Sequence, residues 1–364
     1  MRILYIAPEL TNSGGIARVM ALKANYFSTF LGYEVHILAP NSADASFFYE
    51  FDSKINWYSI THFGNSLRFL YNYIRYINET ISKIKPDVII ICDALYWSYL
   101  PWIIKSQSPI IFETHVSTSL RKIWFKGLFG KLRFALVQSI KLYSKRKFDK
   151  VVFETQDGSN EWNLKNSKVI PNPLSFILPK QSDLKNKKAV AVSRHSYEKG
   201  IDRLLEIWKK VIENHPDWKL DICGQWDEDL RYQKMATDLQ ISKNVNFIAP
   251  TLEIQNHYFE SSFYLMTSRS EAFGMVLIEA MACGLPCVAY DCPCGPRSII
   301  TNHVNGFLIE DGNETDYLKA VEMLIENENL RRELGNNSLE SIKKYDMTTI
   351  MQIWHELLEG LVKS

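Results

Sequence analysis

The sequence predicts an α/β protein made of two doubly wound domains. Short strand-like runs alternate with amphipathic helical runs along nearly the whole chain, which is typical of parallel sheets covered by helices on both faces. The length of 364 residues is sufficient for two domains, each with its own core. A stretch without either periodicity, rich in proline, polar residues and lysine, lies at 171–188 and is expected to be the linker.

Each half contains five segments with the length and composition of buried strands, and helices are expected between them. In the first half these are 2–7, 34–39, 87–92, 109–113 and 150–154. In the second half they are 189–193, 218–223, 245–248, 263–266 and 287–290. From about 330 to 363 the pattern is almost entirely helical, with a break expected near Tyr345 and Asp346.

We therefore expect a first domain over 1–170 and a second over 189–347. Ligands of open parallel sheets bind beyond the carboxyl ends of the strands, and each segment singled out below follows a predicted strand. Two sheets whose loop edges face each other would enclose one central cleft, which is the geometry that we expect.

Composition and charge exclude several classes of function. The chain is 46% apolar and 23% charged, as in soluble globular proteins. A formal net charge of +1 provides no overall field that would attract nucleic acid. No apolar run approaches the length of a membrane span, and the first nine residues turn polar too early for a signal peptide. We expect a cytoplasmic protein.

Four of the six cysteines fall close together, at Cys283, Cys287, Cys292 and Cys294. Their spacing resembles neither a disulfide framework nor the paired cysteine units of a structural zinc site. We favour reduced core or loop thiols, with a metal site as the alternative.

Two glutamates, Glu271 and Glu279, lie eight positions apart around a predicted strand-to-helix turn. The helix is expected over 274–283, closed by Gly284 and Pro286, and its first amides would attract phosphate. Carboxylates beside such an anion site are explained by hydroxyl groups that need acceptors, as on a sugar and a ribose. This motif favours a nucleotide sugar as the ligand.

Eight helical residues would separate these carboxylates by about 12 Å. A retaining glycosidase needs about 5 Å and an inverting one about 6.5 to 9.5 Å, so hydrolysis by a flanking pair is disfavoured. The alternative is that Glu271 caps the helix and Glu279 lies solvated on its outer face.

Arg194 and Lys199 lie in the loop after the predicted strand at 189–193. Two converging cations suit a diphosphate, and they would replace the metal that neutralises such a leaving group in other enzymes. The alternative is a solvated basic loop.

Gly14 and Gly15, after the first strand, could let the backbone approach a ligand closely. G-x-G-x-x-G is absent there, and a structural tight turn is the alternative.

Three further features are weaker. His115 follows the strand at 109–113 and is expected to face the cleft, although a lone histidine is more often structural. Asp227 and Asp229 could hold a divalent ion, but we favour capping of the helix that begins near Leu230.

Between Arg121 and Lys147 (residues 121–147) lie nine basic residues and no acidic one. That stretch suits an anionic membrane surface, or else a packed helix with solvated lysines.

Together these segments resemble the family 4 retaining glycosyltransferases, whose fold is the GT-B type with two Rossmann-like domains. The resemblance extends from end to end. It is specific in the second half, where 194–200 and 271–279 match that family's R-x(4)-KG and E-x(7)-E patterns in order and spacing. The end of the chain, about 348–364, resembles the helix that crosses back onto the first domain in that family.

The resemblance implies a role for each matching residue. Arg194 and Lys199 would bind the donor diphosphate, Glu271 the transferred sugar, and Glu279 the ribose, while His115 would lie beside the donor sugar. The remaining donor-site positions are Gly14, Gly15, Gly224 and the amides of Phe273, Gly274 and Met275. No cofactor or metal is implied. Ala17 stands where many members carry glutamate, so the acceptor chemistry could differ.

The family's reaction is a front-face displacement with retention, in which the leaving diphosphate helps to take the acceptor proton. The loop at 291–300 resembles one in bacterial members that transfer N-acetylgalactosamine, galactose or related sugars to polyprenyl-diphosphate-linked glycans, with Cys294 and Arg297 departing from it.

The resemblance thus favours a UDP-sugar donor, such as UDP-GalNAc, UDP-GlcNAc, UDP-galactose or UDP-glucose. The acceptor would be a glycan or a polyprenyl-diphosphate-linked glycan in bacterial surface polysaccharide biosynthesis, at the inner membrane face. The alternatives are a nucleotide-sugar epimerase on a similar frame and a non-catalytic nucleotide-sugar-binding protein.

Overall fold

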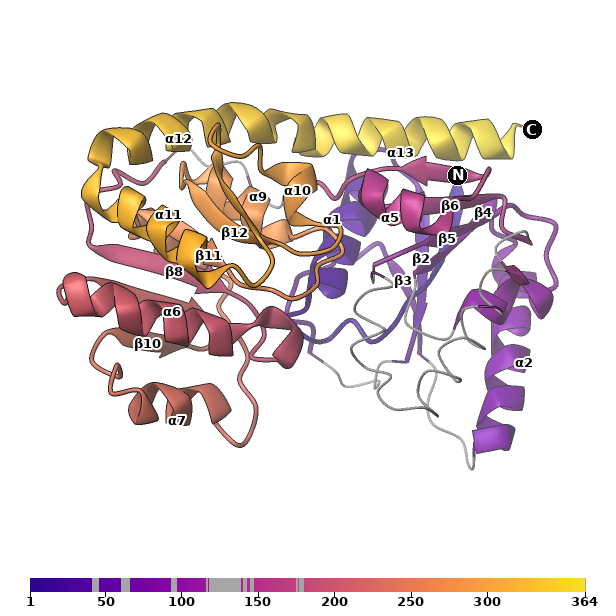
Figure 1. Cartoon of the computed structure of the whole chain (residues 1–364). Coiled ribbons are helices and arrows are strands. Elements are labelled where there is room, and N and C mark those ends of the chain that lie inside the picture. Colours follow the sequence, from indigo (N-terminus) through magenta and orange to yellow (C-terminus); the bar gives the residue numbers. More distant parts are fainter. Residues whose placement is uncertain are drawn as a thin grey trace. The chain divides into compact units, whose positions relative to one another are not determined.

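The computed structural model describes residues 1–40, 46–59, 66–92, 97–115, 117, 139, 143–144, 147–174, 176 and 180–363. Of 66–70 and 97–99 it describes the backbone alone. The chain divides into two compact units, one formed by Met1–Ser175 with Met347–Ser364 and the other by Phe176–Asp346. Each unit is built on one parallel β-sheet with helices packed against it (Figure 1).

The first unit contains a seven-stranded sheet in the order β3-β2-β1-β4-β5-β6-β7, in which every pair is parallel. Its strands are β1 (Arg2–Ile6), β2 (Glu34–Ala39), β3 (Asn56–Ser59), β4 (Val88–Cys92), β5 (Ile110–Glu113), β6 (Lys150–Phe153) and β7 (Ser167–Val169). Its helices are α1 (Gly15–Thr29), α2 (Ser66–Ile84), α5 (Gln156–Trp162) and α13 (Met347–Val362), with a 3-10 turn, η1 (Trp97–Trp102).

Alternate residues of this sheet enter two separate hydrophobic cores, because successive side chains of a strand point to opposite faces. Ile3 and Tyr5 of β1 belong to the core that includes side chains of α1 and α13. Leu4 and Ile6 belong to the core that includes side chains of α2 and α5. Helices therefore cover both faces, as in a doubly wound fold.

The second unit contains a six-stranded parallel sheet in the order β10-β9-β8-β11-β12-β13. Its strands are β8 (Lys188–Val192), β9 (Lys219–Cys223), β10 (Val245–Ile248), β11 (Phe263–Met266), β12 (Cys287–Asp291) and β13 (Gly306–Glu310). Its helices are α6 (Ile201–Asn214), α7 (Arg231–Asp238), α8 (Ile254–Phe259), α9 (Met275–Ala282), α10 (Pro296–Ile299), α11 (Glu314–Glu326) and α12 (Glu328–Ser341). Two 3-10 turns, η3 (Tyr197–Lys199) and η4 (Ile342–Tyr345), complete it.

The predicted fold class of two doubly wound parallel sheets is confirmed. Every predicted strand is present, with each end within one residue of its expected position. Three strands were not predicted, namely β3, β7 and β13, and each lies at the edge of its sheet. An edge strand has one neighbour and is partly exposed, so its sequence carries a weaker apolar signal.

The expected break near Tyr345 is also confirmed, because α12 is followed by η4 and a new helix begins at Met347. This last helix, α13, contributes Ile350, Met351, Trp354 and Leu358 to the core of the first unit. The chain therefore ends on the unit where it began, as the resemblance implied. No helix in the described part of the chain combines the length and apolar character needed to cross a membrane.

Candidate active site

The centre of the candidate site in the second unit is an ion pair between Lys199 and Glu271. Lys199 Nζ donates to both carboxylate oxygens of Glu271, at 2.7 and 2.8 Å, and Ser268 Oγ donates to Oε1 at 2.7 Å. Lys199 follows β8 and Glu271 follows β11, which are neighbouring parallel strands. Both loops therefore emerge at the same carboxyl edge of the sheet. The structure brings the R-x(4)-KG and E-x(7)-E motifs together.

The loop at 291–300 holds the Glu271 segment in place. The amide of Glu271 donates to the carbonyl of Pro293 at 3.4 Å, and Glu271 forms an isolated parallel bridge with Cys294. A Cβ at Gly295 would lie 2.4 Å from the carbonyl oxygen of Phe273 and 2.8 Å from Glu271 Cβ. Glycine is needed at 295 because any side chain would displace the backbone that carries Glu271.

The second glutamate, Glu279, is fully buried, and the Tyr258 hydroxyl donates to its Oε2 at 3.3 Å. The alternative of a solvated Glu279 is therefore wrong. The capping alternative for Glu271 is also wrong, since Gly274 precedes α9 and none of the described side chains makes its N-terminal cap bond. The 12 Å estimate assumed eight helical residues, whereas α9 begins only at Met275, so that argument against a glycosidase does not hold as stated.

Arg194 lies at the start of the same loop as Lys199 and is the more accessible of the two cations. Its side chain is 58% exposed and contacts Glu198 at 3.4 Å. The backbone of Gly224, after β9, approaches this loop so closely that an added Cβ would lie 1.9 Å from the carbonyl oxygen of Ser193. Packing alone thus explains the glycine at 224, and its predicted contact with a donor stays a prediction.

The predicted residues of the first unit lie at the carboxyl ends of its strands. Gly15 begins α1, and the amide of Gly14 donates to Asn12 Oδ1 at 2.8 Å. A Cβ added at Gly15 would meet no atom within 4 Å. Within the described residues neither packing nor a left-handed backbone requires glycine at 15, and its contact with a ligand stays a prediction.

His115 belongs to a network of buried charged groups beyond β5 and β6. Its Nδ1 lies 2.9 Å from Glu154 Oε1, and its Nε2 lies 3.6 Å from Glu113 Oε1. Lys23, from α1, donates to Glu113, while Asn172 Nδ2 donates to Glu154 at 2.7 Å. All five side chains are buried. His115 is thus held on a fixed set of partners.

The charges of this network balance only if His115 is protonated, because two carboxylates then face one ammonium and one imidazolium. Burial alone lowers the pKa of His115, but Glu113, with smaller contributions from Cys92 and Glu154, raises it well above its ordinary value. Burial favours the neutral form of Glu113, yet Lys23 and His115 lower the pKa of Glu113 to about 2. His115 is therefore an imidazolium at neutral pH.

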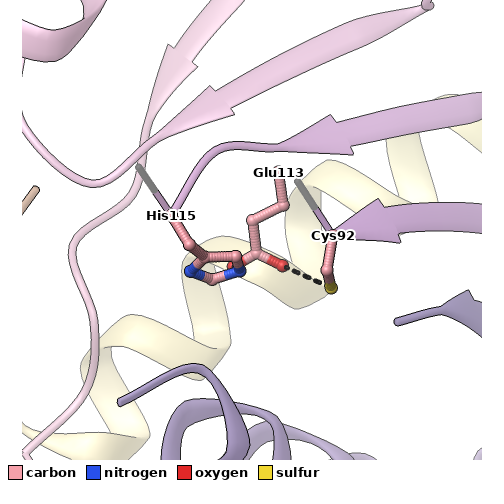
Figure 2. A group of neighbouring side chains, drawn as sticks. All are labelled: Cys92, Glu113 and His115. Carbon is pink, nitrogen blue, oxygen red and sulfur yellow. Dashed lines mark hydrogen bonds and ion pairs between the residues drawn. The ribbon is translucent and has the colours of Figure 1, made fainter. Parts of the chain in front are cut away.

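Cys92, Glu113 and His115 each direct one possible metal ligand into the same space, with these atoms within 4.8 Å of one another (Figure 2). Metal binding requires a thiolate, a carboxylate and a neutral imidazole with available lone pairs. Lys23 already occupies Glu113, the imidazole is protonated, and burial raises the pKa of the Cys92 thiol. These contacts favour an ion network over a metal centre for this group.

Two further features that were considered as metal ligands have structural roles in the described residues, namely Asp227 and the cysteines. Asp227 Oδ1 accepts a hydrogen bond from the amide of Arg231, the first residue of α7, at 3.0 Å. This is the helix-start role favoured for this aspartate. The six cysteines, all described, are buried and free of disulfides. Burial raises the pKa of Cys283, Cys287 and Cys292, as expected for reduced core thiols.

The basic stretch lies mostly outside the described residues, which include only 139, 143–144 and 147 of it. There, Tyr143 stacks on Trp102 with ring centroids 5.0 Å apart, and Lys147 Nζ lies 5.0 Å from the Trp102 ring centroid. Both aromatic residues are exposed, at 63% and 44%.

His195, between Arg194 and Ser196, was not predicted to matter. It is buried among the rings of Trp226, Tyr232 and Phe247, and neither ring nitrogen has a hydrogen-bond partner in the described part of the chain. Burial lowers the pKa of His195 to about 4. No local pattern indicated this burial, because a histidine among polar loop residues is usually solvated.

Two family models match the chain and together span nearly all of it. Glycosyltransferase Family 4 matches residues 13–175, and Glycosyl transferases group 1 matches residues 177–341. The chain belongs to the family 4 glycosyltransferases.

Known proteins agree with this assignment. An uncharacterized glycosyltransferase of Haemophilus influenzae and the amylovoran biosynthesis glycosyltransferase AmsD of Erwinia amylovora are each 28% identical, and each match covers 98% of this chain and 99% of the relative. A mutant of S. aureus TarM, crystallised with fondaparinux, alpha-GlcNAc-glycerol and UDP, superposes with a TM-score of 0.81 at 17% identity, covering 98% of this chain and 99% of TarM. The fold of this glycosyltransferase is the GT-B type.

Replacing Lys23 with methionine should destabilise this glycosyltransferase by about 3 to 5 kcal/mol, because Glu113 would be left buried without its ammonium partner. The free energy of unfolding from urea titration measures this change. Lys187→Met is the matched control, since Lys187 pairs with Asp217 on the surface and should contribute little. Equal stability of the two variants would contradict the importance of the buried network.

His195 should make the protein less stable as the pH falls from about 6.5 towards 4. The pKa of His195 is lower in the folded state than in the unfolded chain. The unfolded chain therefore binds more protons in this range, and the folded state loses stability as the pH is lowered. Between pH 7.5 and pH 5 the expected loss is about 2 kcal/mol. Comparing urea unfolding of the wild type and His195→Phe at both pH values isolates this effect, which should be missing from the variant. The same pH dependence in both proteins would argue against a neutral buried imidazole.

Proposed function

We propose that this glycosyltransferase is a retaining, metal-independent enzyme that transfers a sugar from a UDP-sugar to a glycan or polyprenyl-diphosphate-linked acceptor. The observation that carries the proposal is the contact of the Lys199 ammonium with both oxygens of Glu271 at the carboxyl edge of the second sheet. One small region thereby offers a cation for a diphosphate and a carboxylate for sugar hydroxyls.

In this proposal Arg194 and Lys199 bind the donor diphosphate. Arg194 is exposed enough to reach a ligand with its fork of N–H donors, whereas Lys199 supplies a point charge. The amides of Phe273, Gly274 and Met275, at the start of α9, favour the same anion. Glu271 would accept from hydroxyls of the transferred sugar, and Glu279 from the ribose. Gly224 would line the donor site.

The chemistry is a substitution at the anomeric carbon. The bond from this carbon to the diphosphate oxygen breaks, and the acceptor hydroxyl forms a new bond on the same face. The acceptor proton passes to the departing diphosphate, so that the products are the glycoside and UDP. Arg194 and Lys199 stabilise the charge that develops on the leaving group. Positioning and electrostatics then supply the catalysis, without a covalent intermediate.

We assign His115 to the donor sugar as a hydrogen-bond donor and not as a base. Its Nδ1 is engaged with Glu154, and its Nε2 makes no hydrogen bond within the described residues. An imidazolium has a proton on both nitrogens and no lone pair to accept one. Gly14 and Gly15 would line the same ligand, since Gly15 leaves space for a close approach.

The relatives support the choice of donor and pathway. TarM was crystallised with UDP and alpha-GlcNAc-glycerol, and AmsD takes part in amylovoran biosynthesis. We infer a UDP-sugar donor, with UDP-GalNAc, UDP-GlcNAc, UDP-galactose and UDP-glucose as the candidates, and a role in bacterial surface polysaccharide biosynthesis on the cytoplasmic side of the membrane.

Glu271→Gln should lower the rate of sugar transfer by at least about 10²-fold, because the neutral amide accepts more weakly from sugar hydroxyls. The same variant should bind free UDP more tightly than the wild type, since its side chain no longer competes with the diphosphate for Lys199. Radiolabelled transfer and isothermal titration calorimetry measure the two effects.

Glu260→Gln is the control, because Glu260 pairs with Lys188 on an exposed part of the same unit and should leave both quantities unchanged. Unaltered turnover in Glu271→Gln would remove the central assignment. Interconversion of the sugar by the wild type with donor alone would instead favour an epimerase.

We further propose that residues 121–147 contact an anionic membrane surface, with the exposed Trp102 and Tyr143 beside Lys147 at the headgroup level. Lys131→Glu with Arg133→Glu should weaken cosedimentation with phosphatidylglycerol vesicles. Lys209→Glu with Lys243→Glu changes the net charge equally on the second unit and should have little effect. Equal binding of both double variants would contradict this membrane contact.

A further inference from the structure

Arg269 joins the two loops that carry the candidate catalytic groups. It lies in the segment between β11 and Glu271, and its side chain reaches back to the turn that contains Lys199. Its Nη1 donates to the carbonyl of Tyr197 at 2.7 Å, while its own amide donates to the carbonyl of Glu198 at 2.7 Å. The two residues directly before Lys199 are thus both bonded to Arg269.

The guanidinium is held on two further sides. Nη1 and Nη2 donate to the two carboxylate oxygens of Asp202, at 2.8 and 2.6 Å, and Cζ lies 4.1 Å from the centroid of the Tyr197 ring. Only 13% of the Arg269 side chain is exposed. Asp202 lies in the first turn of α6, so the guanidinium fixes both the turn before Lys199 and the helix after it.

Such a set of contacts requires arginine. Two parallel N–H bonds to one carboxylate, a third bond to a carbonyl and a flat face on an aromatic ring use the planar fork of the guanidinium. A lysine ammonium at the same place could make one or two of these bonds and no stacking contact. The contacts therefore bring positional precision in addition to charge neutralisation.

We propose that Arg269 is a positioning residue that fixes the Lys199 turn against the Glu271 loop, so that both groups meet the donor in one geometry. This inference rests on the proposed function of Lys199 and Glu271. The turn η3 spans only three residues, and the lysine stem is flexible. The place of the Lys199 ammonium therefore depends on where its turn is held, and Arg269 bonds the two residues directly before it.

The test compares Arg269→Lys, Arg269→Gln and Asp202→Asn with the wild type in steady-state transfer. Each variant should lower kcat about tenfold or more, with a smaller change in the KM for the donor and a melting temperature that stays above the assay range. Arg269→Lys should not rescue the rate, although it keeps the charge. Because Arg269 and Asp202 act through one contact, the double variant Arg269→Gln with Asp202→Asn should lose little more than either single variant.

Arg332→Gln is the matched control, since Arg332 also donates two bonds to one carboxylate, that of Glu328, on the exposed face of α12. It should leave kcat unchanged. Lys199→Met is assayed in parallel. If Lys199→Met abolishes transfer while folded Arg269→Lys and Arg269→Gln keep kcat within about twofold of the wild type, the positioning role is overturned and the proposed function stands. If Lys199→Met itself turns over normally, the proposed function fails, and the positioning role fails with it.

Discussion

The contact between the Lys199 ammonium and the Glu271 carboxylate is the interaction on which the candidate site of the second unit depends. Both side chains are largely buried, at 20% and 9% exposed, so the pair loses much of its hydration and contributes little net stability. Its value is positional, because it places a cation and an acceptor side by side. Each is then poised for a different part of one ligand.

Several elements serve that contact without taking part in it. The loop at 291–300 packs its backbone against the Glu271 segment at Gly295, and Arg269 binds the turn before Lys199. Ser268 holds one carboxylate oxygen. These supports come from two parts of the chain, the segment at 268–269 and the loop at 291–300, so residues that fix the site extend beyond the groups that would touch a substrate.

The first unit contains a different arrangement of buried charges. Its network of Lys23, Glu113, His115 and Glu154 is neutral only with a charged imidazole, so the two carboxylates favour the protonated form of His115 against the effect of burial. The ring of Trp354 lies 4.4 Å from Lys23 Nζ, so the last helix covers this ammonium with an aromatic face. The returning helix α13 is thereby part of the environment of the Lys23–Glu113 ion pair.

Structural features that depend on local periodicity could be predicted from the sequence, whereas features that depend on contacts between distant residues could not. The interior strands and the edge strand β10 were found, whereas the edge strands β3, β7 and β13 were missed. Glu279 is buried, although a solvated outer face was one of the two expectations for it, and its helix is otherwise apolar. Arg269 was missed because its partner Asp202 lies 67 positions away in the sequence. His195 was missed because the aromatic rings around it come from separate elements.

At each glycine, the atoms that an added Cβ would meet show whether packing requires glycine at that position. At Gly224 and Gly295 an added methyl group would lie within 2.4 Å of a backbone oxygen, so the fold itself demands glycine there. At Gly15 the same methyl group meets nothing within 4 Å, and the backbone is not left-handed. Packing among the described residues therefore does not require glycine at 15, and the open space agrees with the proposal that a ligand approaches the backbone there.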